Sequence, residues 1–204
     1  MQEIVEELAA LSPEAQARVR EYIAFLRWRS EQAHFAESAA RMRSWQYNFL
    51  EHLDGADIRA SRGDRGMEVK AAEAVVGGER RPALWQHPPV QGEGLVEFHV
   101  PVPSDVRNLR LRFATGIRDG AESGERLVAF RVRIAGWQMW SRACWPISWQ
   151  EAEVALPLQP GDVLRIGFAT DCLGHHPFAW AVWGEPALVG ERGDFDDDSP
   201  AIAE

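Results

Sequence analysis

The sequence predicts a mainly β protein, in which an antiparallel β-sandwich follows an N-terminal α-helical segment. Apolar residues repeat at helical spacing as far as Gly55 and at every second position beyond it. Glycine and proline divide the second part into short runs, and no long helical pattern interrupts these runs. We therefore expect two or three helices over residues 1–56, a sandwich over residues 57–190 and an acidic, disordered tail over residues 191–204.

The helical segment begins at Ser12-Pro13-Glu14, because Ser12 can accept from free backbone amides and Pro13 suits the first turn. Two sets of apolar residues follow at helical spacing: Val19, Tyr22, Ile23 and Leu26, and then Phe35, Ala39, Met42, Trp45, Phe49 and Leu53. Two such helices cannot bury their apolar faces alone. We expect them to pack on the sandwich, on a second copy of the chain or on a partner protein.

The sandwich is predicted from runs in which apolar and polar residues alternate, as in strands with one buried face. These runs are residues 67–76, 96–100, 109–113, 128–134, 152–156, 164–168 and 178–182. Seven or eight such strands suffice for two packed sheets. In the last run, alternation places Trp180 in the core with Phe178 and Val182, and leaves Trp183 exposed.

The composition of the chain limits which binding partners and which cellular compartment we expect for the protein. The net charge of −9 argues against a nucleic-acid backbone as the main partner, because phosphate binding needs a positive face. The acidic N-terminus does not resemble an export signal, and no apolar stretch is long enough to span a bilayer. We expect a cytoplasmic protein in which Cys144 and Cys172 are reduced.

Tryptophan is the strongest functional signal, with nine residues in the chain. Trp137, Trp140, Trp145 and Trp149 fall in a single expected connection between two strands. Exposed indoles offer flat apolar platforms to ligands such as sugars. The alternative is that these rings close one end of the sandwich or form an oligomer contact.

Metal and catalytic motifs are sparse. Asp171-Cys172 and His175-His176 lack the second ligand pair that a structural zinc site needs, so we expect no metal, although Asp119, Glu122 and Glu125 could donate oxygens to calcium.

The chain lacks the common nucleophile, metalloprotease and phosphate-loop motifs, so we expect no enzyme and no cofactor. Carboxylates such as Glu73, Glu97, Glu151 and Glu153 could form a catalytic pair, but surface charge explains them. The arginine rows Arg110/Arg112 and Arg131/Arg133 are expected to meet acidic residues on neighbouring strands.

Several segments resemble galactose-binding-like jelly rolls, and most of all the relatives of carbohydrate-binding modules. They are Pro-Ala-Leu-Trp-Gln-His-Pro-Pro at 82–89, the run 127–134, the Leu-Gln-Pro-Gly-Asp turn at 158–162 and Trp-Ala-Val-Trp-Gly-Glu-Pro at 180–186. The family often has aspartate before the last motif, where this chain has Ala179. Residues 11–29 separately resemble the short helices of bacterial antitoxin-like proteins.

The resemblance implies a non-catalytic module that binds a glycan or another small polar ligand through loop aromatics. Our candidate ligand-binding residues are Trp85, His87, Trp137, Trp140, Trp145, Trp149 and Trp183. His87 precedes Pro88-Pro89 and could equally serve as a hydrogen-bonding group in a rigid turn. The alternative function is a structural or interaction protein, whose N-terminal helices form a homo-oligomer or dock on a partner protein.

Overall fold

A computed structural model describes residues 43–121, 127–156, 163–174 and 176–193, together with residues 16, 19 and 23. The chain divides into two compact units, Met1–Arg43 and Ser44–Glu204. In the first unit, Gln16, Val19 and Ile23 are helical. The remainder of the expected first helix and the acidic run from residue 194 lie outside the described residues.

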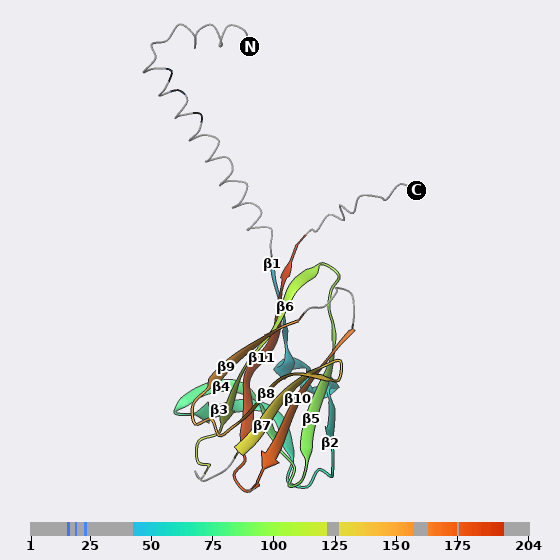
Figure 1. Ribbon diagram of the computed structural model, residues 1–204, viewed down its shortest axis with the longest axis vertical. Coiled ribbons are helices and arrows are strands. Elements are labelled where there is room, and N and C mark those ends of the chain that lie inside the picture. Colours follow the sequence, from blue (N-terminus) through green and yellow to red (C-terminus); the bar gives the residue numbers. More distant parts are fainter. Residues whose placement is uncertain are drawn as a thin grey trace. The chain divides into compact units, whose positions relative to one another are not determined.

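The second unit is a sandwich of two antiparallel sheets, as predicted (Figure 1). In sheet A the order is β3 (Glu68–Val76), β4 (Glu79–His87), β11 (Ala181–Arg192), β6 (Val106–Ile117) and β9 (Gln150–Ala155), and β1 (Arg43–Asn48) also pairs with β11. In sheet B the order is β2 (Asp57–Ala60), β5 (Glu93–Pro101), β10 (Val163–Leu173), β7 (Leu127–Ile134) and β8 (Trp137–Cys144). Strands that are consecutive in the chain often lie in different sheets. The core is therefore built from residues far apart in the sequence.

The helix expected up to Gly55 is wrong for its last part, which forms β1 and the short 3-10 helix η1 (Phe49–Gly55). Trp45 and Tyr47 both pack against the core, whereas their neighbours Ser44 and Gln46 are exposed. This segment therefore has the two-residue period of a strand, which the spacing between Trp45 and Phe49 concealed. Phe49 is fully buried, and its ring centroid lies 4.9 Å from that of Phe98 in the opposite sheet.

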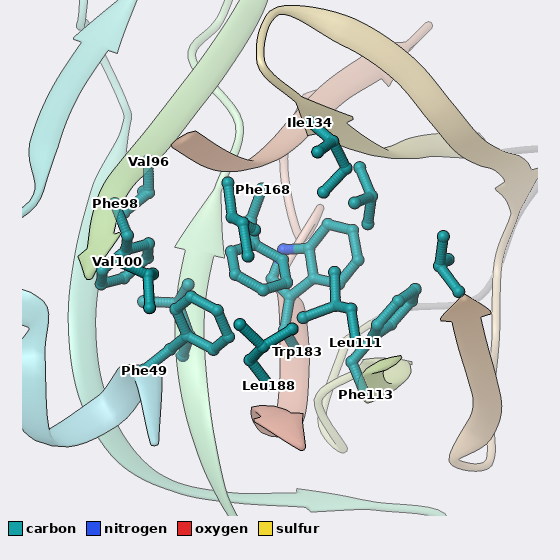
Figure 2. Packing of buried hydrophobic residues seen from close by; sticks show 14 of the residues in the cluster. Phe49, Val96, Phe98, Val100, Leu111, Phe113, Ile134, Phe168, Trp183 and Leu188 are labelled. Atoms are coloured by element: carbon teal, nitrogen blue, oxygen red, sulfur yellow. The ribbon is translucent and has the colours of Figure 1, made fainter. Parts of the chain in front are cut away.

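Trp183 occupies the middle of the core, so the expectation that it is exposed is wrong (Figure 2). Its exposed fraction is 0%, and its ring meets Phe113 and Phe168 edge to face at 5.3 and 5.1 Å. The expectation was wrong because the last strand does not begin at Phe178, as the alternating run suggested. Phe178 has a left-handed φ of 67°, and β11 begins only at Ala181, which reverses the expected inward and outward positions.

A buried glutamine ties Trp183 to both sheets. Gln86 accepts a hydrogen bond from the Trp183 indole N–H at 2.8 Å. Its amide nitrogen donates to the carbonyl oxygens of Gly94 and Phe168 in sheet B, at 3.0 and 2.8 Å. The glutamine and the indole therefore satisfy each other inside an apolar core, where an unpaired polar group is costly.

The two cysteines face the same residue from opposite sides. Cys144 of β8 and Cys172 of β10 both pair with Val128 of β7, which lies between them. Two strand spacings separate their Cα atoms by about 9.5 Å, beyond the limit of about 7 Å for a disulfide. Cys144 and Cys172 are accordingly not joined by a disulfide.

Candidate functional site

The segment with four tryptophans, which we expected to be a connection between strands, consists of strand β8 and the residues just after it. The four indole rings lie in different parts of the sandwich. Trp137 follows the β7–β8 turn and has an exposed fraction of 77%. Trp140 packs edge to face on Phe113 at 4.9 Å, and Trp145 is partly buried against the same core. Trp149 lies on the outer face of sheet A with Val76 and Val182. The four indoles therefore do not form one binding platform.

Trp149 has a structural role on that outer face. Its ring lies directly over Gly116 and Gly184, where a Cβ added to Gly184 would come within 2.8 Å of Trp149 Cζ3. Its indole nitrogen donates to the carbonyl oxygen of Glu79 at 3.0 Å. The two glycines make room for the ring, and no hydrogen-bonding group of the indole remains for a ligand.

A different group of polar and aromatic side chains converges at the other end of this outer face. We call it the Trp85 cluster, and its members are Glu68, Lys70, Trp85, His87, Arg118 and Trp180. Strands β3 and β4 place the first four, because Glu68 pairs with His87 and Lys70 with Trp85 in the antiparallel register. The Arg118 backbone N–H donates to the Trp180 carbonyl at 3.0 Å, which fixes the last two next to each other.

The rings of the cluster are almost parallel. The His87 ring lies 6.0 Å from Trp85 and 6.5 Å from Trp180, each with an interplanar angle of 20°. Lys70 Nζ lies 4.0 Å from the Trp85 ring centroid, and Arg118 Cζ lies 3.5 Å from it. Lys70 belongs to β3 and Arg118 follows β6, and both cations lie over the same Trp85 ring. A sugar ring could stack on Trp85 only by displacing one of them, whereas Trp180 is partly exposed.

His87 is neutral in the folded protein at neutral pH. Its exposed fraction is only 9%, and this burial lowers its pKa from 6.5 to about 4, although the carboxylate of Glu68 opposes the shift. Glu68 Oε2 lies 3.3 Å from His87 Nδ1. The hydrogen bond from Lys70 lowers the pKa of Glu68, so this carboxyl is ionised. The nearby carboxylate of Glu68 favours the tautomer of the neutral imidazole that carries its proton on Nδ1, because an ionised carboxylate can only accept.

Two polar atoms of the cluster are shielded from solvent without a hydrogen-bond partner among the described residues, namely Trp85 Nε1 and His87 Nε2. The indole nitrogen can only donate. In the tautomer that Glu68 favours, His87 Nε2 can only accept. The Trp85 cluster therefore holds one unpaired donor and one unpaired acceptor just below the surface, beside the partly exposed residues Trp85 and Trp180, and a ligand reaches them only when a covering side chain moves.

Sequence analysis selected Trp85 and His87 but not the other members of the cluster. Lys70 and Glu68 reach the site through the β3–β4 register, and Arg118 and Trp180 through the pairing of β6 with β11. The β3–β4 register could have been found from the sequence. Gly77-Gly78 forms a two-residue turn between two alternating runs, and counting outward from it aligns Lys70 with Trp85.

The other charged candidates have partners. Arg110 and Arg112 pair with Glu153 on the neighbouring strand β9, as expected. Arg131 pairs with Asp171 on its neighbour β10, and both Arg131 and Arg133 also reach Glu93 on β5, one strand further away. The carboxylates considered as a catalytic pair also bind arginine: Glu73 pairs with Arg80, Glu97 with Arg59, and Glu151 with Arg81. Charge pairing therefore explains these residues, at the surface for Glu73 and Glu151 and at a buried position for Glu97.

One group of side chains has the composition of a metal site. Asp57, Glu97 and His99 place one ligand atom each within 4.8 Å of one another, on the paired strands β2 and β5. Arg59 already neutralises Glu97 at 2.8 Å. Of the residues that could donate oxygens to calcium, Asp119 uses its two oxygens to accept from the amides of Gly77 and Gly78. Glu122, Glu125 and His175 lie outside the described residues.

Comparison with known proteins gives structural neighbours only, since no protein-family model and no curated protein matches the chain. The tandem CBM51 modules of a family 98 glycoside hydrolase from Streptococcus pneumoniae are 15% identical, with a TM-score of 0.43 over 66% of this chain and 41% of that one. A CBM51 from Clostridium perfringens GH95, in complex with methyl-galactose, is 10% identical, with a TM-score of 0.47 over 71% and 99%. A family 35 carbohydrate-binding module from Clostridium thermocellum is 14% identical, with a TM-score of 0.40 over 72% and 97%.

These neighbours are galactose-binding-like β-sandwich domains, the class that the sequence resembles. The chain spans less than half of the length of the tandem-module structure. None of the helices among the described residues has the length and apolarity needed to cross a membrane.

Proposed function

We propose that the protein is a non-catalytic, galactose-binding-like module that binds a carbohydrate or a similar polar ligand at the Trp85 cluster. The observation that carries this proposal is the pair of unpaired atoms, Trp85 Nε1 and His87 Nε2, beside the partly exposed ring of Trp180. A ligand hydroxyl can both accept from an indole N–H and donate to an imidazole nitrogen.

The chemistry of the cluster suits a ligand with a polar rim and an apolar face. Sites for small ligands combine aromatic surface with a few fixed polar groups. Trp180 supplies aromatic surface, and the ion pair of Glu68 with Lys70, at 2.6 Å, supplies further donors and acceptors at the edge. The ring stack holds these groups in place before a ligand arrives, which lowers the entropy cost of binding.

Calorimetry with a panel of soluble mono- and oligosaccharides tests the proposal. We expect binding by the full chain, and a loss of at least tenfold in affinity in His87→Ala and Trp180→Ala. Trp137→Ala is the matched control, because it removes an exposed indole from the other sheet. Absence of binding across the panel, or a loss confined to Trp137→Ala, would overturn the proposal for the Trp85 cluster.

A second candidate function is contact with a protein, and one specific observation favours it. Trp137 and Met139 on β8 and Ile147 just after it are large apolar side chains exposed by 77, 45 and 72%. β8 is also an edge strand of sheet B. Light scattering of the full chain and of Trp137→Ala tests a homo-oligomer at this edge, and would also detect association through the N-terminal segment. A monomer at all concentrations would remove this candidate.

A further inference from the structure

Arg118 differs from most partly buried arginines of the sandwich because, among the described residues, no carboxylate lies within ion-pair distance of its guanidinium. Within the described part of the chain, no ion pair and no side-chain hydrogen bond involves Arg118, whereas Arg81, Arg131 and Arg133 are all paired with carboxylates. Its contacts are aromatic, at 3.5 Å from the Trp85 ring centroid and 5.3 Å from that of Trp180.

This position leaves the hydrogen-bonding capacity of Arg118 unused. A stacked guanidinium keeps its N–H donors in its own plane, parallel to the ring, so they remain directed toward the edges. The contacts with Trp85 and Trp180 restrict the side chain, so little further entropy is lost when an acceptor binds. The planar fork of donors matches a carboxylate, sulfate or phosphate group.

The cluster has two cations, Lys70 and Arg118, and one acidic residue, which interacts electrostatically with both. Glu68 is the acidic member of the cluster, and it lies 2.6 Å from Lys70, whose charge it neutralises. His87 is neutral at neutral pH. The cluster therefore has a net positive charge in a chain whose formal charge is −9.

From these observations we infer that the ligand of the Trp85 cluster carries an oxyanion, and that Arg118 binds it. This inference rests on the proposed function, and it narrows the ligand class to acidic, sulfated or phosphorylated sugars. The oxyanion lies against the edge of the guanidinium, while a ligand hydroxyl meets His87.

Calorimetry with matched sugars tests the inference on the full chain. Galactose and galacturonate differ only at one carbon, and galactose 6-sulfate, galactose 6-phosphate and inorganic sulfate distinguish the source of the charge. We expect at least one acidic sugar to bind about tenfold or more tightly than galactose, and 1 M NaCl to remove most of this preference. Inorganic sulfate alone should bind more weakly than that acidic sugar.

The variants separate charge from stacking. We expect Arg118→Gln to abolish the preference, and Arg118→Lys to keep only part of it, because lysine has the charge without the fork. Arg112→Gln is the control, since Arg112 lies on β6 of the same sheet and pairs with Glu153. Circular dichroism confirms that each variant is folded.

The outcomes distinguish the two proposals. Equal affinity for galactose and every acidic sugar, or a preference that survives in folded Arg118→Gln, would overturn the inference and leave the proposed function standing. Absence of binding by neutral and acidic sugars alike would overturn both. Equal binding of inorganic sulfate and the best acidic sugar would support the oxyanion contact and contradict the role of the sugar.

Discussion

Burial of His87 makes the stability of the sandwich depend on pH in a calculable way. Unfolding exposes a histidine whose pKa returns from about 4 to 6.5. Between these values the unfolded chain binds a proton that the folded protein does not, so stability falls as the pH falls. Lowering the pH from 7 to 4 therefore reduces the free energy of unfolding by about 3 kcal/mol. This is slightly less than the full effect of a pKa difference of 2.5, because the folded protein itself begins to bind the proton near pH 4.

Urea denaturation at pH 7, 6, 5 and 4 measures this effect in the wild type and in His87→Gln. Carboxylates also titrate over this range, so the informative quantity is the difference between the two proteins. We expect the free energy of unfolding of the wild type to decline more steeply below pH 6.5 than that of His87→Gln. Relative to pH 7, the additional loss in the wild type should reach about 3 kcal/mol at pH 4. His99→Gln, at an exposed position of β5, is the control. Curves for wild type and His87→Gln that stay parallel would refute the assignment of His87 as a buried neutral group.

Three further predictions concern the core and the outer face. Gln86→Leu should lower the free energy of unfolding by about 3 kcal/mol or more, as measured by urea denaturation, because an indole N–H and two carbonyls lose their partner. Gly184→Ala should cost about 1–3 kcal/mol in the same assay, because the methyl group meets Trp149. Gly55→Ala, with nothing within 4 Å of the added Cβ, is its control. Cys144 and Cys172 should form no disulfide with each other under mild oxidation, because β7 lies between their strands, so that mass spectrometry after unfolding finds both thiols alkylated.

Each of these predictions has a contradicting outcome. Unchanged stability in Gln86→Leu would mean that the buried hydrogen bonds contribute nothing net. Equal stability of the two alanine variants would show that Trp149 moves freely off the sheet. An intramolecular disulfide would require β7 to leave its place between β8 and β10.

Seven strands of the sandwich could be predicted because apolar and polar residues alternate along them, whereas β2 and β4 fall in none of the predicted runs. Alternating runs such as residues 96–100 and 128–134 form β5 and β7, with Val96, Phe98 and Val132 inside the core. The N-terminal strand β1 was missed because its aromatic residues also fit a helical period. Strand β8 was missed because it is an edge strand with few buried side chains, so its sequence shows little alternation.

The arrangement of the tryptophans could not be predicted from their spacing. Trp183 is buried and Trp180 faces the cluster, because Phe178 turns the chain just before β11 and shifts its alternation. Trp85 and His87 were selected from a family resemblance. Arg118 and Trp180 join them only because β11 lies between β4 and β6, which is a property of the sheet order and not of any local motif.

The most direct test of the account follows the indole N–H resonances of the tryptophans by NMR during titration with the sugar panel. We predict that the resonances of Trp85 and Trp180 shift and saturate together, while that of Trp137 stays in place. A shift of Trp137 alone, or no indole shift at saturating sugar, would contradict binding at the Trp85 cluster.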